Sequence, residues 1–462
     1  MSGKSWIRKK SEKNRVKGNL ELAALLAGFI GGWDASASFF VFPDIRDNFA
    51  GGDAAAASWV LTVTNIVGAA LLLQSGRLTD KSGPQRLYKF GVQIFVLGVV
   101  LSTIAPTLWF LIIARGLSAA SQALMGPAAI ALVIKYSGKG HESEAVGRWG
   151  FYTAVAGAIS PLIVTQLIST FTWRSLFALQ VPIGLFVLYC LSGIQLPKGG
   201  DTSVSIRPLD SVITISGLTL IILPIVKADS WGISSTKTLS FFLAGLALLT
   251  ILVKKSSESP SSPLQLQLFK NRNFVCASVM SLFAGIAFYA HWMSVLLFMT
   301  EIWDYGIVKA GLILTIMPGS MSLFSISFGR MSDNRGFRWV IIPGIFVYSL
   351  LFLFLWLWIG PDESMIFLIP ALIGSGIGMA TVWPTLTAIG ASGTEESLLG
   401  SATSVIHTIQ RVGGALGIAV VLAIIGSVGE FGSFEALRAG LLVMPMAGAV
   451  TLICALFLDK RA

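Results

Sequence analysis

The chain has 462 residues and a formal net charge of +10; 54% of its residues are apolar and only 12% are charged. Soluble domains contain about 25% charged residues, so most of this surface has to face hydrocarbon instead of water. The composition excludes a soluble globular protein and predicts one that is built into a bilayer.

Long apolar runs recur along the chain, and a helix needs about 20 apolar residues to cross a hydrocarbon core. The runs lack the alternation of barrel strands, and lipid offers no hydrogen-bond partners to the backbone, so the predicted fold class is an all-α polytopic membrane protein. We predict fourteen spans, at residues 20–43, 55–75, 90–106, 108–134, 149–168, 176–196, 212–226, 239–253, 274–299, 310–328, 340–359, 365–389, 402–428 and 437–458.

Positive charge follows these spans. Of the 33 Lys and Arg residues, 25 fall in the tails and in alternate loops on one side, here named the basic side, and six fall on the opposite side. By the positive-inside rule we expect a multi-pass cell-membrane protein with both termini in the cytoplasm and no nucleic-acid partner. The charged tail runs straight into an apolar segment too long for a signal peptide, so no cleavage is expected.

Two loops on the basic side share a pattern of glycine, arginine, hydroxyl, aspartate and glycine. The shared positions are Gly76, Arg77, Asp80 and Gly83 in the first loop, and Gly329, Arg330, Asp333 and Gly336 in the second. Two parallel halves related by an axis along the membrane normal would produce this repeat.

The second loop follows eight spans after the first, although two simple six-helix halves would separate the loops by six. Two helices are therefore inserted centrally. The expected domains are a basic tail at 1–19, a six-helix bundle at 20–196, the inserted helices seven and eight with their linkers at 197–273, and a second six-helix bundle at 274–462.

The loop motif and several helix motifs resemble the major facilitator superfamily, and specifically its fourteen-span drug:proton antiporter branch. Pro43 and Ile45 match a motif that ends the first helix, and Trp173-Arg174 matches one that opens the sixth. The thirteenth helix is similar to that branch over residues 410–417. The resemblance implies a duplicated helical bundle that exports small molecules by multidrug-type antiport.

Asp34 is the only acidic residue that we place near the middle of a span, where an isolated carboxylate costs several kcal/mol. Desolvation favours its neutral form, which would permit exchange of a proton for a substrate. The alternative is a structural acid that is paired with a buried arginine. Arg115, in the fourth span, is either a fixed cation that tunes Asp34 or an arginine that satisfies helix carbonyls. Trp33 adjoins Asp34 and is predicted to offer a stacking surface to a flat ligand.

His407 and Arg411 lie four residues apart on the thirteenth span and therefore share a helix face. They line either a cavity or the bundle surface, from which arginine can snorkel to a helix end. Basic residues here weaken the case for a polyvalent cation as substrate and favour a neutral or anionic one. Gly157 and Pro161 occupy the region of the family's antiporter motif, although plain helix packing explains small residues there equally well.

The repeated loops are expected to control conformation. Asp80 would cap a helix or hold Arg86 when the cytoplasmic side closes, Asp333 would do likewise, and Gly76 would permit close helix approach. A plain solvated turn is the alternative.

The leading hypothesis is proton-coupled export of a hydrophobic or amphipathic small molecule by alternating access, with Asp34 as the central titratable group. The alternatives are export of an endogenous metabolite, lipid or anion, and a non-transporting membrane sensor with the same fold. Nothing resembles a nucleotide loop, a metal cluster or a nucleophile site, so we expect no enzyme activity and no cofactor or metal. The protein is expected to act as a monomer.

Overall fold

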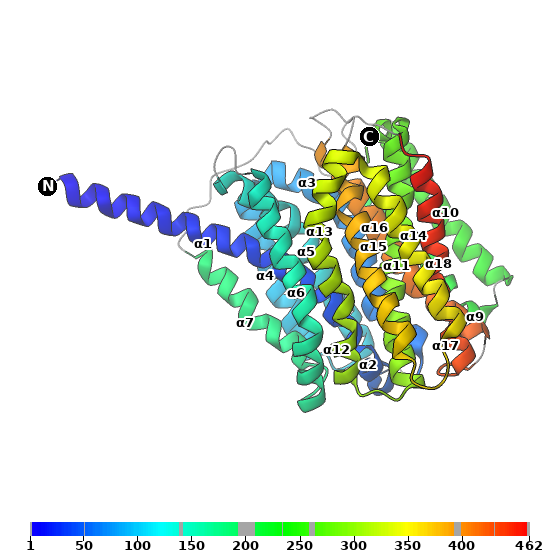
Figure 1. The fold of residues 1–462 in the computed structure, drawn as a ribbon. Coiled ribbons are helices and arrows are strands. Elements are labelled where there is room, and N and C mark those ends of the chain that lie inside the picture. The colour runs from blue at the N-terminus through cyan, green and yellow to red at the C-terminus, as the bar shows by residue number, and fades with distance from the viewer. Residues whose placement is uncertain are drawn as a thin grey trace.

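The computed structural model describes residues 2–49, 51–137, 142–192, 208–232, 234–257, 264–391, 399–428 and 430–459. Every regular element in these ranges is a helix, which confirms the predicted all-α class (Figure 1). Thirteen helical segments are long and apolar enough to cross a membrane. The shorter apolar helix α7, Ser175–Cys190, occupies the place of the predicted sixth span.

The N-terminal elements are α1 (Ser2–Ala37), η1 (Ser38–Val41), α2 (Phe42–Phe49), α3 (Ala54–Ser82), α4 (Pro84–Thr103), α5 (Leu108–Ser137), α6 (Glu142–Thr170) and α7. The central elements are α8 (Pro208–Val226), α9 (Ala228–Trp231) and α10 (Thr236–Ser257). The C-terminal elements are η2 (Leu266–Lys270), α11 (Arg272–Leu297), η3 (Phe298–Ile302), α12 (Ile307–Leu314), α13 (Ile316–Arg335), α14 (Phe337–Trp358), α15 (Met365–Ala391), α16 (Leu399–Val428), α17 (Phe434–Leu441) and α18 (Val443–Leu456).

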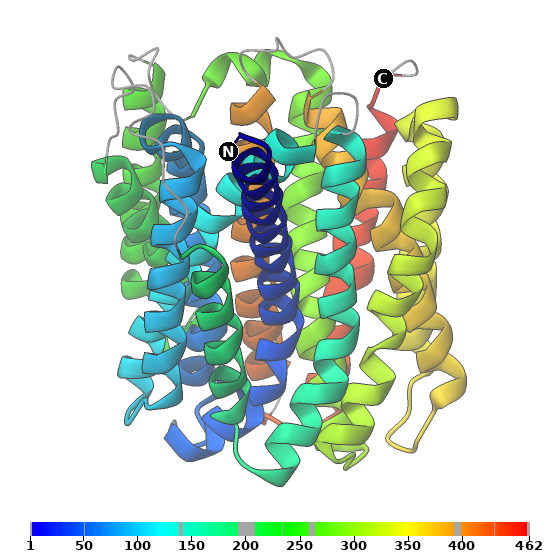
Figure 2. The same ribbon diagram turned by 90° about the vertical axis from the view of Figure 1, so that its left-hand side faces the viewer.

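The helices stand side by side as one bundle, from which the start of α1 projects (Figures 1 and 2). Helices α1 and α3–α7 pack mainly on one another, as do α11–α18. The two groups meet along α3 and α16, between η1 and α11, and where α6 meets α12 and α13. Asp34 and Arg115 both lie on the N-terminal side of these seams.

The two inserted helices form a hairpin on the outside of the bundle. Helix α8 packs against α3 and α16, and α10 packs chiefly on α8. Leu239, Phe242, Leu243 and Leu246 of α10 are exposed. Such a surface suits contact with lipid tails, and it places α10 away from the centre of the bundle.

Both repeated loops are turns of a single glycine. Gly83 caps the end of α3 and the start of α4, and Gly336 does the same between α13 and α14. Their φ angles are +79° and +86°, a region that residues with a Cβ rarely adopt. The glycine N–H donates to Thr79 O at 2.8 Å in the first loop and to Ser332 O at 2.9 Å in the second. The sequence repeat is thus also a repeat of turn geometry.

Candidate functional site

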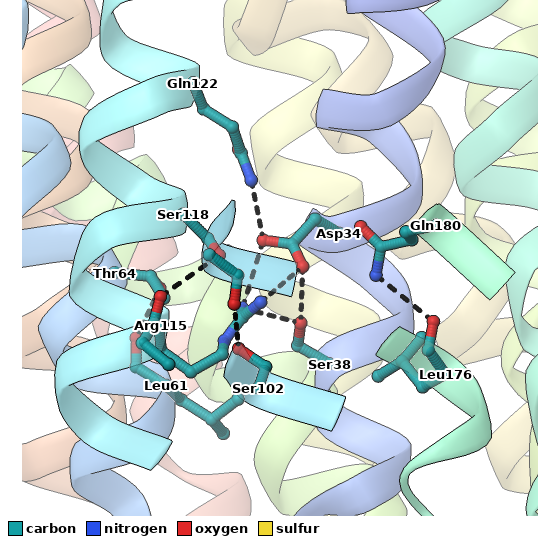
Figure 3. Close-up of polar contacts among 12 residues, drawn as sticks. Asp34, Ser38, Leu61, Thr64, Ser102, Arg115, Ser118, Gln122, Leu176 and Gln180 are labelled. Carbon is teal, nitrogen blue, oxygen red and sulfur yellow. Dashed lines mark hydrogen bonds and ion pairs between the residues drawn. The ribbon is translucent and has the colours of Figure 1, made fainter. Parts of the chain in front are cut away.

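A buried ion pair joins α1 to α5. Arg115 donates from Nη1 to Oδ1 of Asp34 at 2.8 Å and from Nη2 to Oδ2 at 3.0 Å (Figure 3). Asp34 is 7% exposed and Arg115 is 1% exposed. This two-bond geometry is the strong form of an arginine–carboxylate contact, and each charge compensates the other inside the membrane span.

Two neutral side chains complete the shell around the carboxylate. Ser38, one turn beyond Asp34, donates to Oδ1 at 3.1 Å and accepts from Nη2 of Arg115 at 2.9 Å. Gln122, two turns beyond Arg115 on α5, donates from Nε2 to Oδ2 at 2.9 Å. Asp34 therefore accepts four hydrogen bonds, all of which favour its ionised form. This corrects the expectation from desolvation alone, which favoured the neutral form, because the charge of Arg115 and the neutral donors compensate the burial.

Helices α6 and α7 close the site from two further directions. The ring of Phe177 on α7 lies 5.3 Å from the guanidinium carbon of Arg115. Gln180, one turn further along, is buried and donates from Nε2 to Leu176 O at 3.3 Å. On α6, a Cβ placed on Gly157 would lie 3.3 Å from Oγ of Ser36, so the antiporter-motif region packs directly beside the Asp34 segment.

The segment that follows Asp34 contacts the C-terminal helices. Phe39 stacks on Trp292 of α11 with ring centroids 6.0 Å apart, and Phe40 meets the same ring edge-on at 6.0 Å. Phe39 also lies 5.8 Å from the ring of Tyr289. Ser38 thus links the carboxylate of Asp34 to a segment that touches the other half of the molecule.

Ion pairs gather on the side opposite the loop motifs, here named the far side. Arg46 at the end of α2 donates to Glu301 of η3 at 2.9 Å, which ties the N-terminal helices to the C-terminal ones. Lys227 bonds Asp53 at 3.0 Å and joins α3 to the inserted hairpin. Partial burial of Asp53 opposes its ionisation, but the Ala56 N–H and Lys227 outweigh it and hold the carboxyl pKa below its usual value.

The predicted residues on α16 lie on the seam with α3. Nδ1 of His407 is 2.9 Å from Oε1 of Gln410. Arg411 lies against α3, where Nη1 would be 2.8 Å from a Cβ placed on Gly68. His407 and Arg411 share a face as predicted, and Arg411 packs at the contact between the two halves.

Other predicted residues lie elsewhere. Trp33 is buried and stacks on Phe29 with centroids 5.9 Å apart, so it packs within the N-terminal helices in this conformation. Pro161 lies inside α6, and its carbonyl accepts from Thr165 at 2.6 Å close to Gly311 of α12. The antiporter-motif region therefore also borders the seam with the C-terminal helices.

In this structure the loop motif forms the turns between consecutive helices. Arg86 and Arg330 are exposed, and Arg77 is half-buried with an interaction partner. A Cβ on Gly76 would meet only Oγ of Ser404, at 3.9 Å, so the expected close helix approach is not needed there. The side chains of Asp80 and Asp333 lie outside the described part of the structure, and their capping role stays a prediction.

Sequence reasoning missed Ser38 and Gln122. Ser38 is four residues after Asp34, and Gln122 is seven after Arg115, so helical periodicity places each on the same face as its charged neighbour. A search for polar residues at these spacings would have found both.

The bundle of apolar helices with a shielded charge pair in its interior defines a polytopic membrane protein with an internal polar site. The model of the Major Facilitator Superfamily matches residues 24–418 and, in a second match, 277–461. The chain belongs to the Major Facilitator Superfamily, a family of transporters.

Individual relatives are distant. The chain is 26% identical to the MFS-type transporter EfpA of Mycobacterium tuberculosis, over 85% of this chain and 74% of that protein. It is 24% identical to the probable multidrug resistance protein EmrY of Escherichia coli, over 88% and 79%. The structure of the nucleoside transporter NupG superposes with a TM-score of 0.65 at 13% identity, covering 96% of this chain and 98% of that one, which shows the shared fold.

Proposed function

We propose that this protein exports a hydrophobic or amphipathic small molecule in exchange for protons, by alternating access, with Asp34 as the group that binds the proton. The observation that carries the proposal is the shielded pair of Asp34 and Arg115 within the span region, bonded through Ser38 to a segment that packs on the opposite half. An ionisable residue inside a membrane is by default a functional residue.

The geometry supplies a mechanism for coupling. A proton on Asp34 removes the charge that Arg115 and Gln122 bond, so the neutral carboxyl no longer holds both donors. Ser38 then loses its charged acceptor, and the packing of Phe39 and Phe40 on Trp292 is free to change. Proton binding would in this way alter the equilibrium between conformations that open to opposite sides.

Contacts between the two halves close the molecule on the far side. The bond between Arg46 and Glu301 joins the two halves there, and Phe431 lies 5.1 Å from the guanidinium carbon of Arg46. These contacts would have to separate before a substrate leaves on that side.

We include in the proposal that the basic side is cytoplasmic, that the halves are the bundles 20–196 and 274–462, and that the protein works as a monomer.

Relatives support the choice of substrate class. EmrY carries the name of a multidrug resistance protein, and the site here is bordered by Phe39, Tyr289 and Trp292. Aromatic surfaces bind flat apolar molecules through stacking and burial.

The test is proton flux in proteoliposomes that contain the purified protein and a pH-sensitive dye. Lipophilic cations, neutral amphiphiles and amphipathic anions are added in turn, and wild type is compared with Asp34→Asn. Substrate-evoked proton movement that disappears in Asp34→Asn is the expected result. Substrate transport that continues in Asp34→Asn with unchanged pH dependence would refute the role of Asp34, and binding without transport would indicate a sensor.

A further inference from the structure

Arg411 differs from Arg115, the other arginine that lies away from the span ends, because no carboxylate compensates it. Within the described residues it forms no hydrogen bond and no ion pair, although it lies in the span 401–428 and is half-buried. An arginine in this setting usually faces a partner or a water-filled space. The missing partner is the starting point of the inference.

The neighbours of Arg411 on α3 and α16 show where its side chain lies. Its Nη1 lies against Gly68 of α3, while one turn along α16 a Cβ on Gly414 would lie 2.8 Å from the ring of Tyr289 and 3.0 Å from Oδ1 of Asn65. Ala415, one turn after Arg411, packs with residues of both α3 and α8. Arg411 therefore lies on the side of α16 that meets α3, between the contact of Gly414 with α11 and the contact of Ala415 with α8.

Further hydrogen-bond donors lie beside it. Gln410 is 3% exposed; its Oε1 bonds His407, and its Nε2 has no partner in the described structure. The ring of Tyr289 and Oδ1 of Asn65 both lie against Gly414, one turn after Arg411. A guanidinium and an amide N–H are donors that suit a carboxylate.

An aromatic cluster continues from this donor set. The ring of Tyr289 lies 5.8 Å from Phe39 and 5.5 Å from Phe288, and Phe288 lies 5.0 Å from Trp383. Tyr289 thus connects the cluster to Gly414, one turn after Arg411 on α16. The arrangement places one positive charge at the edge of an aromatic surface.

We infer that Arg411 binds the anionic group of the substrate, and that the substrate class is a small aromatic or amphipathic carboxylate whose apolar part packs on Phe39, Phe288 and Tyr289. The inference rests on the proposed transport function and makes its substrate specific. A cation would meet the uncompensated charge of Arg411 and be repelled. Arg115 does not serve in the same way because Asp34 already occupies both of its terminal nitrogens.

The test measures equilibrium binding to the full-length purified protein, which needs no proton gradient. The probes are 1-naphthoate, 1-naphthamide and 1-naphthylmethylammonium, which share one ring system and differ in charge. Wild type is compared with Arg411→Gln, with Arg411→Lys, and with Lys309→Gln, which removes an exposed positive charge on the far side. Size-exclusion chromatography checks that each variant is folded and monodisperse.

Wild type should bind naphthoate at least about tenfold more tightly than naphthamide, a factor that one charge-assisted hydrogen bond supplies. Arg411→Gln should abolish this preference, Arg411→Lys should keep part of it, and Lys309→Gln should leave it unchanged. An anion preference that survives in Arg411→Gln, or tightest binding of the ammonium probe, would overturn the inference.

Two further measurements distinguish failure of the carboxylate site from failure of proton coupling. Displacement of naphthoate by phosphatidylglycerol but not by phosphatidylcholine would assign Arg411 to a lipid phosphate and overturn a carboxylate site. Proton flux evoked only by cations would contradict this inference and leave the proposed antiport intact. Binding of naphthoate that depends on Arg411, without proton flux, would uphold the site and refute proton coupling.

Discussion

Two arginines lie away from the ends of the predicted spans, and their surroundings differ. Arg115 is 1% exposed and donates to Asp34 and Ser38, whereas Arg411 is half-buried and has no partner in the described structure. Arg115 lies within the N-terminal helices, and Arg411 lies on the seam with the C-terminal ones. The contrast indicates that the charge within one half is neutralised by a side chain in this conformation, while the charge between the halves is available to a ligand that binds there.

The largest expected effect comes from removing the paired arginine. Arg115→Ala leaves the carboxylate of Asp34 buried without a counter-charge, and the free energy of unfolding should fall by about 3–5 kcal/mol. Arg411→Ala removes no pair and should change it by less than about 1 kcal/mol. Unfolding by SDS titration in mixed micelles measures both. Equal losses in the two variants would show that Arg411 has a strong partner and would end the contrast.

A smaller effect is expected from the shell of the pair. Gln122→Leu removes the bond to Oδ2 of Asp34 and should cost about 1.5–3 kcal/mol, the range for hydrogen bonds to charged groups. Gln166→Leu is the matched control, since Gln166 bonds only the exposed Thr170. The same SDS titration compares them. If both glutamines give the same small loss, Gln122 does not support the ionised form of Asp34.

A third arginine lies between these extremes. Arg46 bonds Glu301 across the far-side seam, and the two side chains are 12% and 23% exposed. A double-mutant cycle with Arg46→Gln and Glu301→Gln should give a coupling of about 1 kcal/mol, as expected for contacting residues. Cross-linking of cysteines introduced at these two sites would show whether the contact opens during transport. A coupling energy near zero would show that this ion pair does not help to close the far side.

The smallest effect is expected at the exposed pair of Asp53 and Lys227. The pKa of Asp53 is lowered in the folded protein, so its contribution is complete above the unfolded-state pKa of about 3.9 and is lost as the pH falls through the folded-state value. Because the pair is partly solvated, the difference in unfolding free energy between wild type and Asp53→Asn should be at most about 0.5 kcal/mol at pH 7. It should decrease as the pH falls below the unfolded-state value; a difference that grows on acidification would contradict the assignment.

Hydropathy predicted the fold well because burial in lipid constrains every span. The predicted second span at 55–75 corresponds to an observed segment at 54–79, and the eighth at 239–253 to 236–256. The sixth was placed at 176–196, and its helix ends at Cys190. Span ends depend on caps and turns, which hydropathy does not register.

The site was predicted only in part. The cost of an isolated carboxylate identified Asp34, and the same logic identified Arg115, but the bond between them depends on how α1 and α5 are rotated against each other. The sequence alone does not determine how these two helices are rotated. The aromatic contact between Phe39 and Trp292 was missed for the same reason, since it joins segments more than 250 residues apart.

The single-residue turns at Gly83 and Gly336 have a mechanical consequence. One glycine ends α3 and begins α4, and another ends α13 and begins α14, so neither joint has spare chain to absorb a displacement. The end of α3 and the start of α4 therefore cannot move apart at the basic side, and the same holds for α13 and α14. A displacement of one helix end at that side has to be followed by the joined end of its neighbour.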